Sequence, residues 1–169
     1  MIKMKTSTVT NNKKMSFTRK EYMGGIPGSK IVRFTMGNTN KQFSHRVKLI
    51  TIKSGQILHN AFESARIAAL RHLERQLERN NFMLKIIPYP HQVIREHKRV
   101  NVAQADRFQE GMKKAYGKPA AVAARVNRRD DIFIAEVEKE NINEAKKALE
   151  KASHKLPLPM KILVEKIDY

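Results

Sequence analysis

The chain has 169 residues, of which 34 are Lys or Arg and 16 are Asp or Glu, and it contains no cysteine. This length suffices for one domain with a buried core, and the lack of cysteine excludes disulfides and thiolate metal sites or nucleophiles. The first 130 residues carry 27 basic and eight acidic residues, whereas the last 39 carry seven and eight. Because the imbalance is so uneven, we expect a polyanionic partner, namely nucleic acid.

The sequence shows no sign of a membrane span or a secretion signal. No apolar run approaches the roughly 18 residues that cross a bilayer, and the basic N-terminal region lacks the aliphatic face of an interfacial helix. Met1 to Lys14 also lacks the apolar centre of a signal peptide. We therefore expect a cytoplasmic protein without membrane contact.

The beginning of the chain is predicted to be irregular. Residues 1–16 are polar and basic without periodicity, and form an N-terminal extension to a single α+β domain over residues 17–169. Residues 24–30 contain three glycines and a proline, which indicates a turn whose backbone can approach a phosphate closely. Four cations flank this turn: Arg19, Lys20, Lys30 and Arg33. An ordinary loop with solvated cations is the alternative.

Next come two strands and the clearest helix of the chain. Residues 31–34 and 47–52 have strand character, with a loop over residues 41–46 between them. Residues 57–80 are predicted to be a helix. Its apolar stripe is formed by Phe62, Ala65, Ala69 and Leu73, widened by Leu70 and Leu77.

A second face of this predicted helix carries arginines at every fourth position, Arg71, Arg75 and Arg79. Such a row could follow an RNA backbone. However, Glu74 and Glu78 lie three residues after the first two arginines, so the row could instead be a solvated surface of ion pairs. The sequence slightly favours the solvated surface.

The second half of the chain is predicted to contain four strands and one helix. Residues 82–87 and 92–97 form strands joined through Pro88-Tyr89-Pro90, and residues 120–127 and 132–137 form a hairpin. Asn141 is expected to cap the last helix together with Glu144. The buried face of that helix is predicted to be Ala145, Ala148, Leu149 and Ala152, and the final strand spans residues 160–166. The fold class is therefore α+β, a mostly antiparallel sheet with two main helices on one side.

A long basic loop over residues 98–118 separates the predicted strands. It mixes cations, two glycines and lone aromatic residues, with no apolar run that could build a core. Loops of this length inside a compact domain are uncommon and usually functional. Its Phe108 and Tyr116, like Phe17 and Tyr22 near the N-terminus, are placed among cations where they could stack on unpaired bases. The small number of aromatic residues favours docking onto folded RNA over general single-strand binding.

The loop also carries a family resemblance. Ala105-Asp106-Arg107, Gln109 and Gly111-Met112, followed by residues 115–119 (Ala-Tyr-Gly-Lys-Pro), resemble the signature of one family of large-subunit ribosomal proteins. That family comprises the archaeal and eukaryotic L-ten-e proteins and their bacterial counterpart L-sixteen, and this chain is archaeal-like. Further matches are residues 18–22, 25–31, 90–95 and 124–126, so the resemblance runs from about Phe17 to about Glu165.

The resemblance implies an α/β-hammerhead-like fold with a basic N-terminal arm. It also implies a structural constituent of the large ribosomal subunit, bound to rRNA near the peptidyl-transferase centre and helping to position aminoacyl and peptidyl tRNA. The implied partners are large-subunit rRNA, the tRNA acceptor region and neighbouring ribosomal proteins. The rRNA-binding candidates are Arg19, Lys20, Tyr22, Gly25, Gly28, Lys30, Arg33, Lys41, Arg46, Arg95, Lys118 and Arg125. The candidates in the tRNA-facing loop are Lys98, Arg99, Asp106, Arg107, Gln109, Gly111, Lys113, Lys114 and Tyr116.

Enzymatic alternatives find little support in the sequence. Gly111 and Gly117-Lys118 are separated by five residues rather than the four of a Walker A motif, and Pro119 replaces its hydroxyl residue. The six histidines lack metal-ligand spacing, and Asp106, a lone acid, is expected to brace Arg107. We therefore expect no catalysis, metal, cofactor or small-molecule substrate. A free-standing RNA-binding or RNA-chaperone protein remains the alternative, and an RNA-modifying or phosphotransfer enzyme is a second rival.

Overall fold

The computed structural model describes residues 16–96 and 117–167. In these ranges the chain forms two antiparallel sheets and two α-helices, which confirms the α+β class. The strands are β1 (Thr35–Gly37), β2 (His45–Thr51), β3 (Gly55–Leu58), β4 (Phe82–Ile86), β5 (Gln92–Glu96), β6 (Lys118–Val126), β7 (Asp131–Val137) and β8 (Met160–Lys166). The helices are α2 (His59–Gln76) and α3 (Ile142–Ser153), with 3-10 turns η1 (Lys20–Tyr22) and η3 (Lys139–Asn141).

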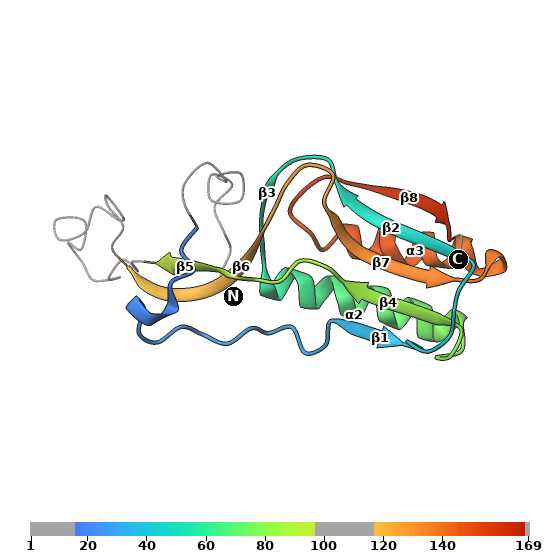
Figure 1. Ribbon diagram of the computed structural model, residues 1–169, viewed down its shortest axis with the longest axis horizontal. Helices are drawn as coiled ribbons and strands as arrows, with labels where there is room; N and C mark the ends of the chain where they lie inside the picture. Colours follow the sequence, from blue (N-terminus) through green and yellow to red (C-terminus); the bar gives the residue numbers. More distant parts are fainter. Residues whose placement is uncertain (1–15, 97–116, 168–169) are drawn as a thin grey trace, which may run out of the picture.

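The larger sheet has five strands in the order β1-β4-β7-β2-β8. Helices α2 and α3 lie side by side on one face of this sheet (Figure 1). Its other face, which we call the open face, carries the alternate side chains of the strands. Arg46 lies there between Glu136 on β7 and Glu165 on β8, its partners in register. Alternation along each strand thus separates an apolar core from a charged surface.

The core lies between the five-stranded sheet and the two helices. Val47 and Leu49 of β2 are fully buried, and Phe62 of α2 packs near Phe133 of β7 with ring centroids 6.5 Å apart. The predicted helix stripe is confirmed, because its four central residues are all inaccessible to solvent: Phe62, Ala65, Ala69 and Leu73. The predicted apolar face of α3 is likewise fully buried: Ala145, Ala148, Leu149 and Ala152.

The smaller sheet has three strands in the order β3-β6-β5 and extends from one end of the helix-covered body (Figure 1). The central strand β6 pairs with β3 through Gly55↔Val126 and with β5 through Gln92↔Ala123. Strand β3 was not predicted, because its four buried residues show no alternation and run directly into the apolar pattern of α2. The predicted helix start at residue 57 is therefore two residues early.

The two predicted connections between neighbouring strands do not form hairpins. Strand β4 belongs to the larger sheet and β5 to the smaller one, and the same division separates β6 from β7. The predicted hairpin of residues 120–127 and 132–137 is therefore wrong. Strand β7 instead lies between β4 and β2. At the crossing between sheets, the Arg129 N–H donates to the Thr51 carbonyl and the Thr51 N–H donates to the Asp130 carbonyl.

Two local predictions also need correction. The early strand covers Thr35–Gly37 rather than residues 31–34. Asn141 is at the start of α3 but makes no side-chain capping hydrogen bond. The Glu144 carboxylate instead accepts from Lys147 of the same helix at 2.7 Å and lies 3.1 Å from His72 Nε2 of α2, so the second contact joins the two helices.

Candidate nucleic-acid interface

The leading segment, residues 16–34, is held against both sheets and helix α2. At its beginning, the Phe17 backbone N–H donates to Gln92 Oε1 at 2.8 Å, and the Val93 N–H donates to the Phe17 carbonyl at 3.0 Å. The Arg95 guanidinium lies 3.9 Å from the centre of the Phe17 ring, a cation–π contact. The first described residues thus extend the edge of the smaller sheet at β5.

The 3-10 turn η1 presents a basic and aromatic surface. Tyr22 is 75% exposed, and the Arg19 guanidinium lies 5.4 Å from its ring centre. Arg19 also lies 3.8 Å from the Glu21 carboxylate, whereas the exposed Lys20 side chain contacts no other residue that the structure describes. An exposed ring beside unburied cations has the chemistry needed to stack on an unpaired base next to a phosphate.

The glycine-rich turn after η1 is exposed and open. Gly25 has φ +73°, and a Cβ added at Gly25 or Gly28 would meet no heavy atom within 4 Å. The space around the backbone is therefore free for a close approach by an RNA phosphate, the role predicted for this turn. No contact within the chain requires Gly28 to be glycine, so the prediction that it binds rRNA stays open to test.

After the turn, the leading segment is attached to the beginning of α2. The Lys30 N–H donates to His59 Nδ1 at 3.1 Å, and the Val32 N–H donates to Glu63 Oε2 at 3.3 Å. Burial, assisted by the nearby charge of Lys30, lowers the pKa of His59. The neutral imidazole is thus the form that accepts the hydrogen bond, while the Lys30 side chain stays exposed.

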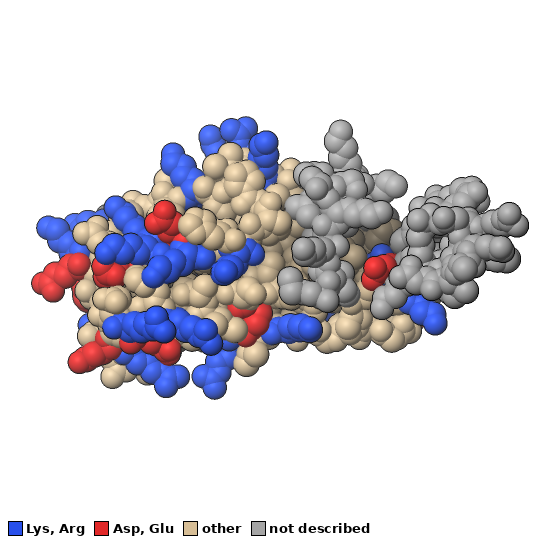
Figure 2. Space-filling view, turned by 180° about the vertical axis from the view of Figure 1, so that it is seen from behind, with Lys and Arg blue, Asp and Glu red and all other residues tan. Residues whose placement is uncertain are grey.

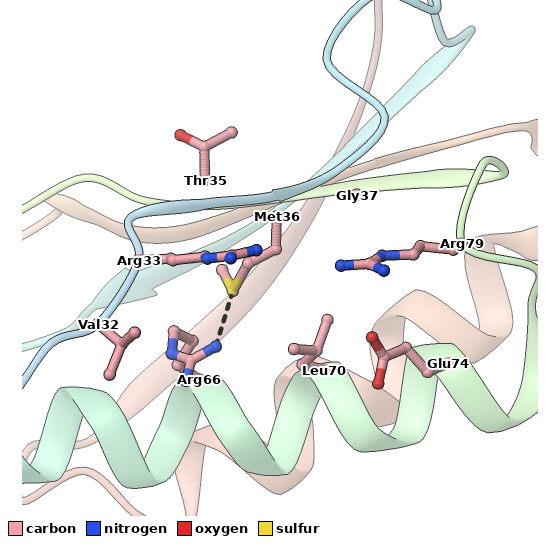
Figure 3. Close-up of a pocket in the computed structure, with 9 residues that line it drawn as sticks. All are labelled: Val32, Arg33, Thr35, Met36, Gly37, Arg66, Leu70, Glu74 and Arg79. Atoms are coloured by element: carbon pink, nitrogen blue, oxygen red, sulfur yellow. Dashed lines mark hydrogen bonds between the residues drawn. The ribbon is translucent and has the colours of Figure 1, made fainter.

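Between the leading segment and α2 lies a cavity of about 330 Å³, which we call the arginine groove (Figure 3). It is lined by Val32, Arg33, Thr35, Met36, Gly37, Arg66, Leu70, Glu74 and Arg79. The side chains of Arg33 and Arg79 point toward each other from opposite ends, above Leu70. Arg66, only 8% exposed, is held by the Glu63 carboxylate at 2.5 and 2.9 Å and lies 3.2 Å from the sulfur of Met36.

Cations on the open face of the larger sheet have acidic partners. Arg46 pairs with Glu136 at 2.6 Å, and Lys48 pairs with Glu165 at 2.7 Å and Asp131 at 3.7 Å. The hydrogen bond that the Lys48 ammonium donates to the Glu165 carboxylate is the main reason that the pKa of Lys48 is raised. Arg46, one of the predicted rRNA-binding residues, is therefore neutralised by a carboxylate of the neighbouring strand.

The remaining predicted residues are dispersed over the body and the smaller sheet. Lys41 lies 3.7 Å from Glu138, Lys118 is exposed opposite Glu96 at the end of β6, and Arg125 is half-buried opposite Gln56. Strand β6 already begins at Lys118, so the loop predicted to reach this residue ends before it. Seven predicted residues therefore lie on the leading segment, and Arg95 packs against its beginning, whereas Lys41, Arg46, Lys118 and Arg125 lie elsewhere. The seven are Arg19, Lys20, Tyr22, Gly25, Gly28, Lys30 and Arg33.

The three arginines that were predicted to form one row on the long helix have different surroundings in the structure. Arg71 and Arg75 are exposed, as a solvated surface requires, but the structure shows no ion pair between them and Glu74 or Glu78. Arg79 instead lines the arginine groove. Figure 2, which views the molecule from behind, shows Lys and Arg side chains gathered over the half that holds the helices, with acidic side chains among them.

All predicted residues of the tRNA-facing loop lie outside the described residues, so the role of that loop stays a prediction: Lys98, Arg99, Asp106, Arg107, Gln109, Gly111, Lys113, Lys114 and Tyr116. Within residues 16–96 and 117–167, no group of three or more His, Asp or Glu side chains is placed to hold a metal ion. In the same ranges no helix combines the length and apolar character needed to cross a bilayer.

Sequence reasoning missed two features of this surface. Arg66 joins the arginine groove although it lies within the apolar pattern of α2; its only signal was Glu63, three residues earlier. The second is a row of rings formed by Phe34, Tyr89 and His91, with the first two stacked at 5.4 Å and the last two 4.5 Å apart. Tyr89 is 48% exposed. These rings come from segments more than 50 residues apart, so no sequence spacing could reveal them.

Comparison with known proteins identifies relatives over nearly the whole chain. Residues 11–163 match the family described as ribosomal protein L16p/L10e. A large ribosomal subunit protein uL16 from Staphylothermus marinus is 46% identical over 147 residues, covering 87% of this chain and 84% of that protein. The uL16 protein of Methanosphaerula palustris is 41% identical over 167 residues, covering 99% and 96%. That of Sulfolobus acidocaldarius is 44% identical over 155 residues, covering 90% and 88%.

Proposed function

Because this chain belongs to the ribosomal protein L16p/L10e family, we propose that it binds large-subunit rRNA near the peptidyl-transferase centre and helps to position tRNA. At the coarser level it is a structural constituent of the large ribosomal subunit, in the cytoplasm. Its partners are rRNA and neighbouring ribosomal proteins. The peptidyl-transferase chemistry belongs to RNA, and this protein orients substrates and neutralises charge.

The observation that carries the proposal is the uneven neutralisation of cations. On the open face, Arg46 and Lys48 are paired with carboxylates at 2.6 to 2.7 Å. On the leading segment, Lys20, Lys30 and Arg33 are exposed, and their side chains make no hydrogen bond or ion pair with a described residue. Unpaired cations that repel one another destabilise a free protein, and RNA phosphates relieve that repulsion. We therefore place the rRNA-binding surface along the leading segment.

The loop of residues 98–118 is proposed to face the acceptor end of tRNA. Strands β5 and β6, which are paired from Glu96↔Lys118 inward, form the base from which it starts and to which it returns. A paired base fixes where a loop begins and ends, as binding loops on rigid scaffolds require. Arg107, Lys113 and Lys114 are the candidate phosphate contacts, and Tyr116 is the candidate for stacking.

Fractionation of a lysate on a sucrose gradient, at moderate and then at high salt, tests this function. The protein should migrate with the large subunit and remain there at several hundred millimolar salt, because an integral component makes many contacts at once. Protein that sediments slowly at every salt concentration contradicts the proposal and supports a free-standing RNA-binding or RNA-chaperone protein. Charge reversal of Arg107, Lys113 and Lys114 to Glu then tests the loop, and it should leave the fold intact.

A further inference from the structure

The packing of the protein core does not account for the size and the charge of the arginine groove. Its volume of about 330 Å³ is at the lower end of small-ligand pockets, which suits one nucleotide rather than a double helix. Its walls come from the end of the leading segment, strand β1, one face of α2, and Arg79 just after that helix (Figure 3).

Two of the three arginines in the groove are uncommitted. Arg66 is neutralised by Glu63, to which it donates two hydrogen bonds, and this ion pair lowers the pKa of Glu63 and raises that of Arg66. The Arg33 and Arg79 side chains make no hydrogen bond or ion pair with any residue that the structure describes. They nevertheless point into the same space from its two ends. Two guanidinium groups that approach each other without an anion between them are electrostatically unfavourable.

We propose that the arginine groove binds a single extruded nucleotide of RNA, with its phosphate held between Arg33 and Arg79. This inference rests on the proposed rRNA-binding function. Arginine binds phosphate oxygens in a planar, bidentate arrangement, so two guanidiniums from opposite sides can saturate one phosphodiester. Arg66, whose charge is neutralised by Glu63, supplies a fixed wall of the groove.

The rest of the groove suits the base. Met36 and Leu70 lie between the arginines and provide an apolar surface, against which one face of a base can pack. The planar guanidinium of Arg33, which lies beside Met36, can stack on a base as well as bind its phosphate. An apolar surface beside two phosphate ligands fits a nucleotide better than a bare inorganic anion.

Glu74 gives the groove a preference among bases. Its carboxylate is the one anionic group among the lining residues and is directed toward Leu70. An ionised carboxylate only accepts hydrogen bonds, so it favours a base edge that offers adjacent N–H donors. Guanine offers its imino and amino groups side by side, whereas uracil offers a single imino group between two carbonyls. The groove should therefore bind guanosine more tightly than uridine.

The test measures the affinity of the full chain for 5′-GMP, with 5′-UMP and inorganic phosphate as comparison ligands. Binding is monitored by NMR of the arginine side chains. Two double variants are matched in chemistry and in charge. R33Q/R79Q removes the two arginines of the groove that have no described partner, and R71Q/R75Q removes two exposed arginines of α2 that do not line the groove. GMP affinity should fall at least about tenfold in R33Q/R79Q, because charged hydrogen bonds are lost, and should be unchanged in R71Q/R75Q. E74Q should reduce the preference for GMP over UMP.

Each other outcome overturns the proposal. If inorganic phosphate binds as tightly as GMP, the groove is only an anion site. GMP at about 10 mM is ample to fill a site of micromolar to millimolar affinity. If it leaves the NMR signals of Arg33 and Arg79 unmoved, the groove binds no nucleotide. If R33Q/R79Q loses GMP but binds large-subunit rRNA as wild type does, the ligand is a free nucleotide instead of RNA. Failure of the ribosomal function is distinguishable, because the protein would then leave the large-subunit fraction while still binding GMP.

Discussion

The open face of the larger sheet and the leading segment are both basic surfaces, but their cations differ in what surrounds them. On the open face, Arg46 and Lys48 alternate with Glu136 and Glu165 on adjacent strands and are neutralised within the chain. On the leading segment, Lys20 and Lys30 have no such partner among the described residues. A count of Lys and Arg alone would treat the two surfaces as alike. The contacts indicate that only the second has charge available for RNA.

The same contrast separates stability from binding. Strands β2 and β7 bury one face and pair ions on the other, so most substitutions there should affect the free energy of unfolding. The leading segment buries little and is attached through backbone donors to Gln92, His59 and Glu63. Changes to its exposed side chains should affect RNA affinity and leave the fold in place.

The largest expected effect is a loss of stability when the core between the larger sheet and α2 is disrupted. Phe133 is fully buried between the sheet and α2, where it packs near Phe62. Phe133→Ala should lower the free energy of unfolding by about 3–5 kcal/mol, through lost burial and the cavity left behind. Urea denaturation of the isolated protein measures this loss. A loss below about 1 kcal/mol would show that the sheet and helices do not share one tightly packed core.

A smaller effect on stability distinguishes Gly37 of strand β1 from Gly28 of the leading segment. Gly37 has φ +86°, and a Cβ there would overlap the carbonyl oxygen of Phe82, so Gly37→Ala should cost about 1–3 kcal/mol or more. Gly28 has open space around it, and Gly28→Ala should leave stability nearly unchanged but weaken rRNA binding by covering the backbone. Thermal unfolding and filter binding measure the two quantities. Equal destabilisation by both substitutions would remove the distinction between the two regions.

A still smaller effect, which depends on pH, tests how the leading segment is attached to α2. The pKa of His59 is lowered in the folded protein, so its contribution to stability is present above the ordinary value of 6.5 and is lost as pH falls through the folded pKa. Acidification should therefore release the hydrogen bond from the Lys30 N–H, seen as a lower protection factor of that amide against hydrogen exchange after the intrinsic pH dependence of exchange is divided out. His59→Asn, which keeps an acceptor but cannot titrate in this range, should give a protection factor without this pH dependence. Persistence of the pH dependence in the variant would assign it to another group.

The helices could be predicted from sequence because their burial follows a single period. The stripe from Phe62 to Leu73 and that from Ala145 to Ala152 depend only on which side of the helix meets the sheet. Strand pairing could not be predicted in the same way. Alternation in β6 and β7 is the same whether the strands pair with each other or belong to different sheets, and the choice depends on long-range partners such as β2 and β3.

Part of the candidate site could likewise be predicted from the sequence, and part of it could not. The leading segment could be predicted because charge, glycines and the family motif are contiguous in sequence. The arginine groove could not, because Arg33 and Arg79 are 46 positions apart and meet only after β1 pairs with β4. Arg46 illustrates the opposite limit, since nothing near it in sequence indicates that Glu136, 90 residues later, pairs with it.

The most direct test of the central claim measures how binding of the protein to large-subunit rRNA depends on salt. Two double variants remove equal charge, K20Q/K30Q from the leading segment and R46Q/K48Q from the open face. The slope of log affinity against log salt should decrease by about 1 to 2 for K20Q/K30Q, one phosphate contact per cation, and should stay at the wild-type value for R46Q/K48Q. Equal decreases for the two variants, or a decrease for R46Q/K48Q alone, would contradict the account.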